Sequence, residues 1–349
     1  MNNRQAIWKN WMKNKPTQQD VARLAGVSRA TVSYVLNKRE TENAIPHETT
    51  ERVWAAIHEL GYVPNQQAQH LKRQSTNRIC VILPRLGIPA NDLMIQAQRK
   101  YLAEQDYSII IAVGDTYEHV LKLVTQVRAG LADAVYLSIG YGSIREIDTI
   151  LDQLKDINVP VIVNADVEPT VDYDVSWITE ESGAYEAIEY LIKQGHRRIA
   201  FMGHNIAQLE SYGRYRGYLR AFSDYGIIVQ PEYVRAGLDQ REQAYQTVQE
   251  FLDMKISPTA IFCTSDINAL TAISTIQHRG FTVPDDIAVI GFGNISEGQY
   301  AYPRLTTVGP IEHTFDETAS LMLHRLTATQ QISPTKVIQK WQLIVRESA

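Results

Sequence analysis

The sequence predicts two kinds of structure in one chain: a small all-α headpiece, followed by an α/β core of two lobes with parallel sheets. Three observations carry this prediction. Residues 17–61 contain three short amphipathic helical patterns separated by turn residues. Beyond Arg78, short β-branched runs alternate with helical segments, the order found in parallel α/β folds. The length of 349 residues also exceeds that of one ordinary domain.

Three helices are expected within residues 16–64. The first begins after Thr17, which resembles a capping box with Asp20, and it ends at Gly26. Ser28 caps the second helix, and Gly61 ends the third. The apolar residues expected to face inward are Val21, Leu24 and Ala25 in the first helix, Val32, Val35 and Leu36 in the second, and Val53, Ile57 and Leu60 in the third. Residues 65–76 hold few apolar anchors and are interpreted as a linker.

Seven short apolar runs beyond the linker predict strands that are buried on both faces. They are residues 79–83, 107–113, 134–139, 160–165, 198–203, 260–265 and 287–292. Helical segments lie between them, for example residues 183–195, 214–225, 240–253 and 266–279. The rhythm breaks near residues 172–176, which indicates two linked subdomains.

Charge is distributed unevenly along the chain. Residues 1–78 hold 12 Lys and Arg against 6 Asp and Glu, whereas the remaining residues hold 22 against 33. A basic segment on an acidic body indicates an anionic partner at the N-terminal end. An ordinary solvated basic face has the same charge, so charge alone does not decide between the two.

The composition excludes several classes of protein. No apolar run reaches the length of a bilayer, and the first fifteen residues lack the apolar core of a secretory signal. Cys80 and Cys263 lie far apart without CxxC spacing, which favours a reducing cytoplasm and argues against structural zinc. The histidines form no ligand-spaced cluster. We therefore expect a cytoplasmic protein with no metal, no cofactor and no membrane contact.

The second helix of the headpiece carries a polar stripe on its outer face. Arg29 and Ser33 are four residues apart, as are Ala30 and Tyr34, so these side chains share one side of a helix. Two helices joined by a tight turn form a helix-turn-helix, whose second helix enters the major groove of DNA. The stripe therefore indicates a DNA-reading helix. A small three-helix bundle with a polar outer face is the alternative.

Each residue of this stripe has a chemistry suited to a base edge. Arg29 can donate two hydrogen bonds to guanine, and Ala30 can contact a thymine methyl group. Ser33 lies on the same face, and Tyr34 can reach a base edge or a phosphate. The short donors expected to contact phosphates are Thr17, Thr31, Asn37 and Thr49.

The chain also resembles a known family, through motifs that follow one another in the same order. "TQQDVARLAGVSRATVSYVLN" and "IPHETTERVWAAIHELGYVPNQQAQHL" are similar to the headpiece of the lactose/galactose repressor (LacI/GalR) family of transcriptional regulators. The similarity continues through "GAYEAIEYLIKQGHRRIAFMG", "RYRGY", "FCTSDINALTAI", "GFTVPDDIAVIGFGN", "PRLTTV" and "LIVRES". Only residues 1–15 fall outside it.

The resemblance implies an architecture and a mechanism. The core is expected to be periplasmic-binding-protein-like, with residues 77–178 and 309–335 in an N-terminal subdomain and residues 179–308 and 336–349 in a C-terminal subdomain. The family forms dimers that bind pseudo-palindromic operators. Its linker folds into a hinge helix that inserts a leucine into the minor groove, which here matches Leu71, with Ala68 and Lys72 beside it. Asn65 is expected to contact the backbone.

The resemblance also implies an effector cleft, with departures. Arg214 matches an arginine that binds ligand hydroxyl groups in sugar-responsive members. The other matching positions are Ser265, Asp266, Asp239, Asp166 and Gly293. Several of them lack the carboxylate or aromatic ring that a sugar site uses. A carbohydrate, a charged metabolite, a protein co-regulator and no effector at all therefore stay open.

Two interpretations remain for residues 1–15, and other functions remain for the chain as a whole. Residues 1–15 either form an amphipathic turn that contacts DNA or a partner, or have no such role, which we favour. An enzyme is not favoured, because no dinucleotide-binding, phosphate-binding or nucleophile motif occurs. A cytoplasmic small-molecule binding protein, with a core that has lost or changed its effector response, is the alternative to a repressor. We expect a dimer, because no heptad stripe for a tetramer follows Ser348.

Overall fold

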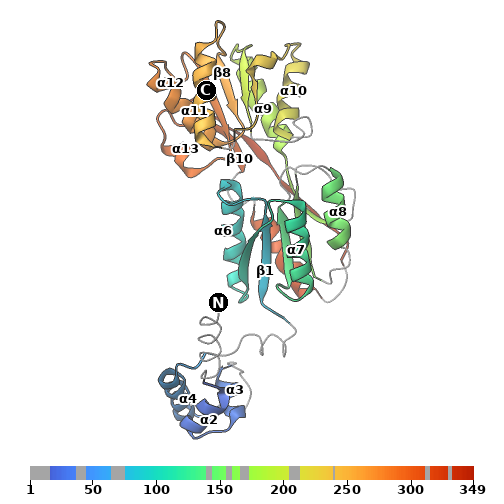
Figure 1. Ribbon diagram of the computed structural model, residues 1–349, viewed down its shortest axis with the longest axis vertical. Coiled ribbons are helices and arrows are strands. Elements are labelled where there is room, and N and C mark those ends of the chain that lie inside the picture. The colour runs from blue at the N-terminus through green and yellow to red at the C-terminus, as the bar shows by residue number, and fades with distance from the viewer. Residues whose placement is uncertain are drawn as a thin grey trace, which may run out of the picture. The chain divides into compact units, whose positions relative to one another are not determined.

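The computed structural model describes residues 16–36, 45–63, 75–138, 144–154, 159–165, 173–203, 213–238, 240–310, 315–328 and 332–349 (Figure 1). The chain divides into two compact units, Met1–Gln74 and Ser75–Ala349. Within the described residues, no helix is long and apolar enough to cross a membrane.

The first unit contains the three predicted helices, α2 (Gln18–Ala25), α3 (Arg29–Leu36) and α4 (His47–Leu60). The predicted capping box is present, because the side chains of Thr17 and Asp20 each bond the backbone N–H of the other residue. Gly26 ends α2 with a positive φ of 65°, which glycine adopts without steric cost. Ser28 Oγ accepts the N–H of Thr31 at 3.0 Å and so caps α3.

The headpiece core is small and confirms most of the predicted inward residues. Leu24 is the exception, because it is 46% exposed while Ala22 is buried in its place. Val21, Ala22 and Ala25 fall on one arc of the helix, and the 100° step per residue carries Leu24 to the outer side of that arc. The residues that make up this core are Val21, Ala22, Ala25, Val32, Val35, Val53, Ala56, Ile57 and Tyr62.

The second unit contains two six-stranded sheets, each in its own subdomain. The first sheet has the order β11-β5-β4-β3-β1-β2, and all its pairs are parallel. The second has the order β12-β10-β9-β8-β6-β7, and only its edge strand β12 is antiparallel. The strand bounds are β1 Arg78–Leu83, β2 Ser108–Val113, β3 Ala134–Ser138, β4 Val161–Ala165, β5 Asp174–Ile178, β6 Ile199–Met202, β7 Val234–Arg235, β8 Ala260–Cys263, β9 Ala288–Phe292, β10 Thr306–Pro310, β11 Lys336–Gln339 and β12 Trp341–Ile344.

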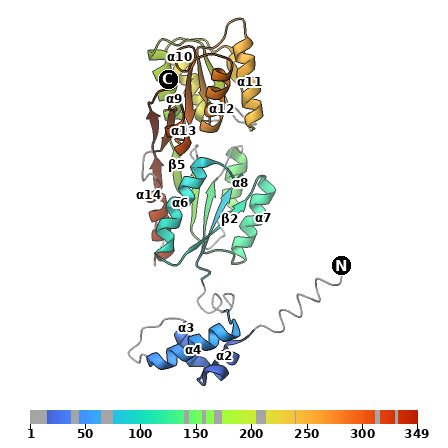
Figure 2. The ribbon, with the colours of Figure 1, turned by 90° about the vertical axis from the view of Figure 1, so that its left-hand side faces the viewer.

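Helices cover both faces of each sheet (Figure 2). On the first sheet, α6 (Pro89–Ala103) and α14 (Asp316–Thr327) pack on one face, and α7 (Tyr117–Arg128) and α8 (Ile144–Leu154) on the other. On the second, α9 (Glu180–Lys193) and α10 (Gly213–Asp224) lie opposite α11 (Arg241–Asp253) and α12 (Asp266–His278). The short α13 (Ser296–Tyr300) and the 3-10 helix η2 (Pro231–Tyr233) complete the described helices. The predicted α/β core of two lobes with parallel sheets is therefore confirmed.

The chain passes between the subdomains three times. It leaves the first sheet after β5, returns between Pro310 and Phe315, and crosses again between β11 and β12. Thr179 joins two of these passages, because its N–H donates to the Gln339 carbonyl at 3.1 Å and its Oγ1 accepts the Trp341 N–H at 3.0 Å. The sequence predicts the last boundary between the two subdomains before residue 336. That boundary lies too early in the chain, because β11 belongs to the sheet of the first subdomain.

Strand β5 occupies residues that the sequence pattern marked as a break in rhythm. Its alternate residues Asp174 and Ser176 are polar, so the run lacks the continuous apolar character of the other strands. Both are nevertheless buried with partners: Arg325 holds the Asp174 carboxylate, and Thr318 bonds Ser176 at 3.1 Å. Buried polar groups are stable in a sheet when each has a partner, which a periodicity argument does not detect.

Candidate functional site

The predicted DNA-reading face lies on the outside of α3. Arg29 and Ala30, at its start, are exposed, and Tyr34 one turn later is 42% exposed. Ser33 is half-buried between them. Val32 and Val35 turn to the interior, so the helix separates an apolar inner side from a polar outer side as the spacing predicts.

The neighbouring helix supports this face. Arg29 Nε lies 3.5 Å from Gln18 Oε1 on α2, so the arginine is oriented by the helix that precedes the turn. The hydroxyl of Thr17 donates to Asp20 at 2.7 Å, and the hydroxyl of Thr31 lies 2.9 Å from that of Ser28. The Thr17 hydroxyl caps α2, whereas the Thr31 hydroxyl bonds the Ser28 hydroxyl that caps α3. Thr49 is half-buried in the first turn of α4.

Several predicted DNA contacts lie outside the described residues. They are Asn37, Asn65, Ala68, Leu71 and Lys72, together with residues 1–15. The described part of the headpiece therefore contains the base-contact stripe but not the hinge.

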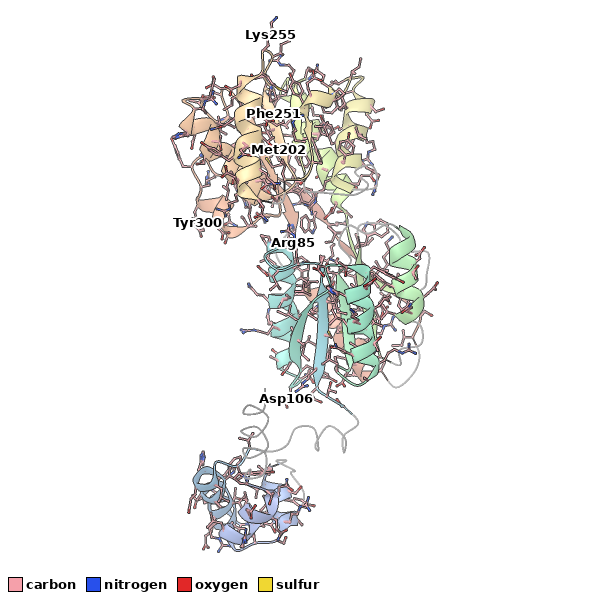
Figure 3. The ribbon with its side chains drawn as sticks, viewed as in Figure 1. Arg85, Asp106, Met202, Phe251, Lys255 and Tyr300 are labelled. Atoms are coloured by element: carbon pink, nitrogen blue, oxygen red, sulfur yellow. The ribbon has the colours of Figure 1, made fainter. Side chains whose placement is uncertain are left out.

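A cleft in the second unit lies between its two subdomains. It encloses about 640 Å³ between protein atoms, including space open to solvent. Four of the predicted effector residues line it: Arg214, Ser265, Asp266 and Gly293. Asp166 and Asp239 lie outside the described residues. The first subdomain contributes the segment after β1, around Arg85 (Figure 3).

Arg214 is fixed by an ion pair rather than lying on the surface. Its side chain is 11% exposed, and that of Glu180 is 10% exposed. Nε and Nη2 donate to the two Glu180 oxygens at 3.1 and 2.6 Å, and Nη1 donates to the Thr264 carbonyl. The guanidinium also lies 4.0 Å from the centre of the Phe292 ring. These contacts hold a positive group in one orientation at the wall of the cleft.

Asp266 is a buried brace within the same wall. Its Oδ2 accepts the Ile295 N–H at 2.8 Å, and its Oδ1 accepts the Thr307 hydroxyl at 2.5 Å. Burial raises the pKa of this carboxyl to about 6, against the stabilising hydrogen bonds. The residue that caps α12 is instead Ser265, whose side chain accepts the Asn268 N–H at 3.2 Å.

Gly293 adopts a backbone conformation that disfavours a side chain at this position. Its φ is 141°, a conformation that side chains with a Cβ rarely adopt. A Cβ would also lie 3.3 Å from Oδ2 of Asp266. The positive φ is therefore the main reason that glycine suits this position, and the contact with Asp266 adds to it.

Other residues of the cleft were not predicted from the sequence. Arg85 and Arg241 line it from opposite subdomains, and Phe292 and Trp341 form an aromatic wall with ring centres 5.1 Å apart. These residues come from four separate segments of the chain, so no motif links them. Strands β9 and β12 therefore supply the aromatic residues that the positions matched from the sequence lack.

The described residues offer no centre for metal or thiol chemistry. Across the described ranges, no group of three or more His, Cys, Asp or Glu side chains is placed to hold a metal ion. Burial raises the pKa of Cys80 to about 11, and it also raises the pKa of Cys263. Both cysteines are buried and free, so neither is a reactive thiolate at neutral pH.

The headpiece and the core together define a class of protein: a DNA-binding regulator whose helix-turn-helix precedes a two-lobed, binding-protein-like core. Residues 17–65 match the family described as bacterial regulatory proteins, lacI family. Residues 188–349 match the family described as a periplasmic binding protein-like domain.

Relatives along the whole chain specify the family. The transcriptional repressor PurR of Erwinia tasmaniensis is 32% identical over 91% of this chain and 93% of its own length. The transcriptional repressor CytR of Escherichia coli K12 is 29% identical over 95% of this chain and 96% of its own length. The chain belongs to the LacI family of bacterial transcriptional regulators. These relatives are repressors, which confirms the expectation of a DNA-binding regulator rather than an enzyme.

Solved structures agree with this fold. A complex of the transcriptional regulator CelR with cellobiose is 27% identical, with a TM-score of 0.68 over 96% of this chain and 100% of that one. The Lac repressor dimer bound to operator and the anti-inducer ONPF is 23% identical, with a TM-score of 0.78 over 96% of this chain and 99% of that one. At that identity, the likeness to the Lac repressor establishes the fold alone.

Proposed function

We propose that this chain is a dimeric repressor whose two headpieces bind the halves of a pseudo-palindromic operator. The observation that carries the proposal is the outer face of α3, where Arg29, Ala30 and Tyr34 are exposed. A ridge of this kind at the start of a second helix fits the major groove and reads base edges.

The contacts divide into those that read sequence and those that fix position. Base contacts are assigned to Arg29, Ala30, Ser33 and Tyr34. Backbone contacts are assigned to Thr17, Thr31, Asn37, Thr49 and Asn65. The hydroxyl groups of Thr17 and Thr31 also have hydrogen-bond partners within the headpiece. The minor-groove wedge is assigned to Ala68, Leu71 and Lys72 in the linker.

A small molecule in the inter-lobe cleft is proposed to set the affinity for DNA. The cleft is lined from both subdomains, so a ligand that contacts both favours one arrangement of the lobes. Arg214, Ser265 and Gly293 form its wall, with Asp166 and Asp239 as further candidates. We assign Asp266 to bracing, because both of its oxygens are engaged within the protein.

The proposed place of action is the bacterial cytoplasm, because the target is chromosomal DNA. Two relatives that share most of the chain are bacterial repressors, which supports this assignment.

The test is a shift assay with palindromic promoter fragments from the protein's own genome, selected by pull-down. We expect retention of one site per two chains, and an affinity that falls steeply as salt rises because phosphate contacts release counterions. A protein that ignores every such fragment at low ionic strength contradicts the proposal. Retention of one chain per site would contradict the proposed dimer but not DNA binding.

A further inference from the structure

We propose that the effector is a small organic anion whose phosphate or carboxylate group lies between Arg85 and Arg241. This inference rests on the proposed function, because it names the class of ligand that the inter-lobe cleft takes. The inference follows from a comparison of the charged side chains among the described residues of the cleft, some of which have an ion-pair partner there while others have none.

Two arginines enter the cleft from opposite subdomains. Arg85 follows β1 in the first, and Arg241 is the first residue of α11 in the second. Both are exposed, and neither has an ion pair among the described residues, unlike Arg214 with its Glu180. Figure 3 shows Arg85 at the end of the first subdomain that faces the second.

Negative charge among the described lining residues does not balance them. Among the described lining residues, Asp266 is the one carboxylate, and its oxygens already accept the Ile295 N–H and the Thr307 hydroxyl. The charge of Arg214 is matched by Glu180. Helices α6, α11 and α12 also begin at the cleft, and the N-terminus of a helix attracts anions.

A buried donor in the same wall lacks an acceptor. Trp341 lines the cleft and is 2% exposed, and its indole Nε1 has no hydrogen-bond partner in the described part of the chain. A buried N–H without a partner is costly, so this donor would be stabilised by any oxygen that reached it. Phe292 packs beside it as the second aromatic residue of the lining, and its ring is covered by the Arg214 guanidinium.

A neutral sugar fits the described part of this lining less well. Paired sugar hydroxyl groups are held by carboxylate acceptors, and the described lining has none that is not already engaged. Two guanidinium groups from facing lobes instead match the oxygens of one anionic group. Because the arginines belong to different subdomains, an anion between them favours the closed arrangement of the lobes.

The experiment uses the full chain without DNA, so its outcome is independent of operator binding. Thermal unfolding is followed in phosphate and in chloride of equal ionic strength, and calorimetry compares glucose 6-phosphate with glucose and succinate with 1,4-butanediol. We expect phosphate to raise the unfolding midpoint, and the anionic member of at least one pair to bind while its neutral partner does not. The pair that responds distinguishes phosphate from carboxylate.

Substitution assigns the binding to these arginines. R85A and R241A should each weaken the anion about tenfold or more, the usual loss when a hydrogen bond to a charged group is removed. K255A changes the charge equally at the far end of the second subdomain (Figure 3) and should have no effect.

Three results overturn the proposal: equal binding of the neutral and anionic members, an anion preference that survives the double R85A/R241A substitution, or no response to any of the anions. Operator binding in the separate shift assay stands or falls independently of all three.

Discussion

The headpiece and the core use polar side chains in opposite ways. In the headpiece, the residues assigned to DNA lie on the outside of one helix, and the small core beneath them is apolar. In the core, important polar groups are buried in pairs, such as Arg214 with Glu180 and Arg325 with Asp174. The side-chain exposures of the second pair are 9% and 8%.

This difference separates recognition from stability. An exposed side chain that meets DNA contributes little to folding, so its removal should be measured in binding. A buried charge contributes through its partner, so its removal should be measured in unfolding.

Arg325→Ala should destabilise the core by about 3–5 kcal/mol, because it leaves a buried carboxylate without its counter-charge. Arg325 donates through Nε and Nη2 to both oxygens of Asp174 at 2.7 Å, and Nη2 also reaches the Ser333 carbonyl at 2.6 Å. Urea unfolding measures the change.

The matched control is Arg279→Ala, which removes an ion pair to Asp253 with side-chain exposures of 33% and 64%. An exposed pair of this kind contributes about 1 kcal/mol or less. If both variants lose the same stability, burial is not the source of the effect.

Asp266→Asn should alter the pH dependence of core stability. The pKa of this carboxyl is raised from 3.8 to about 6, so the folded state holds a proton that the unfolded chain releases between these values. The stability that this proton contributes is complete below pH 3.8 and is lost as the pH rises through about 6. Above that range, the native chain should be less stable than the amide variant by on the order of 3 kcal/mol.

The amide is expected to keep the geometry, since it can accept the Ile295 N–H and donate to the Thr307 hydroxyl. The measurement is the difference in unfolding free energy between the native chain and the variant across this pH range. Asp285→Asn, at an exposed carboxylate, is the control. A difference that rises with pH in favour of the native chain would contradict the prediction.

Arg29→Ala should cost about 1–3 kcal/mol of operator binding and relax base preference at one position of each half-site. The residue is exposed, so the unfolding of the headpiece should hardly change. Competition assays against operators with single base changes measure the preference. The control is Arg23→Ala, on the outer side of α2, which should leave the base preference intact. If Arg29→Ala weakens binding equally for all bases, Arg29 contacts a phosphate rather than a base.

The same contrast explains how much the sequence could predict. The headpiece is built from consecutive helices, so caps at Thr17 and Ser28 and the polar stripe on α3 could be read from spacing. Leu24 was the error there, because its position on the edge of the apolar arc decides its exposure. In the core, the apolar strands could be recognised, whereas β5 was missed because its polar residues find buried partners.

The cleft was harder to predict because it is assembled from distant segments. Arg214 was found through the resemblance, but its Glu180 partner lies on another helix. Arg85, Arg241 and Trp341 come from different parts of the chain and meet only in the fold. A single sequence contains no local pattern for such a meeting, and the charge balance of the cleft depends on it.

The third passage between the subdomains has a consequence for the order of synthesis. Strand β11 borders the first sheet and β12 borders the second, and the two are separated by Lys340 alone. Translation therefore finishes every other strand of both halves before either half receives its last one. The three described headpiece helices are synthesised long before then, so a ribosome-bound chain already carries the predicted DNA-reading face of α3 while both sheets of the core lack their last strands.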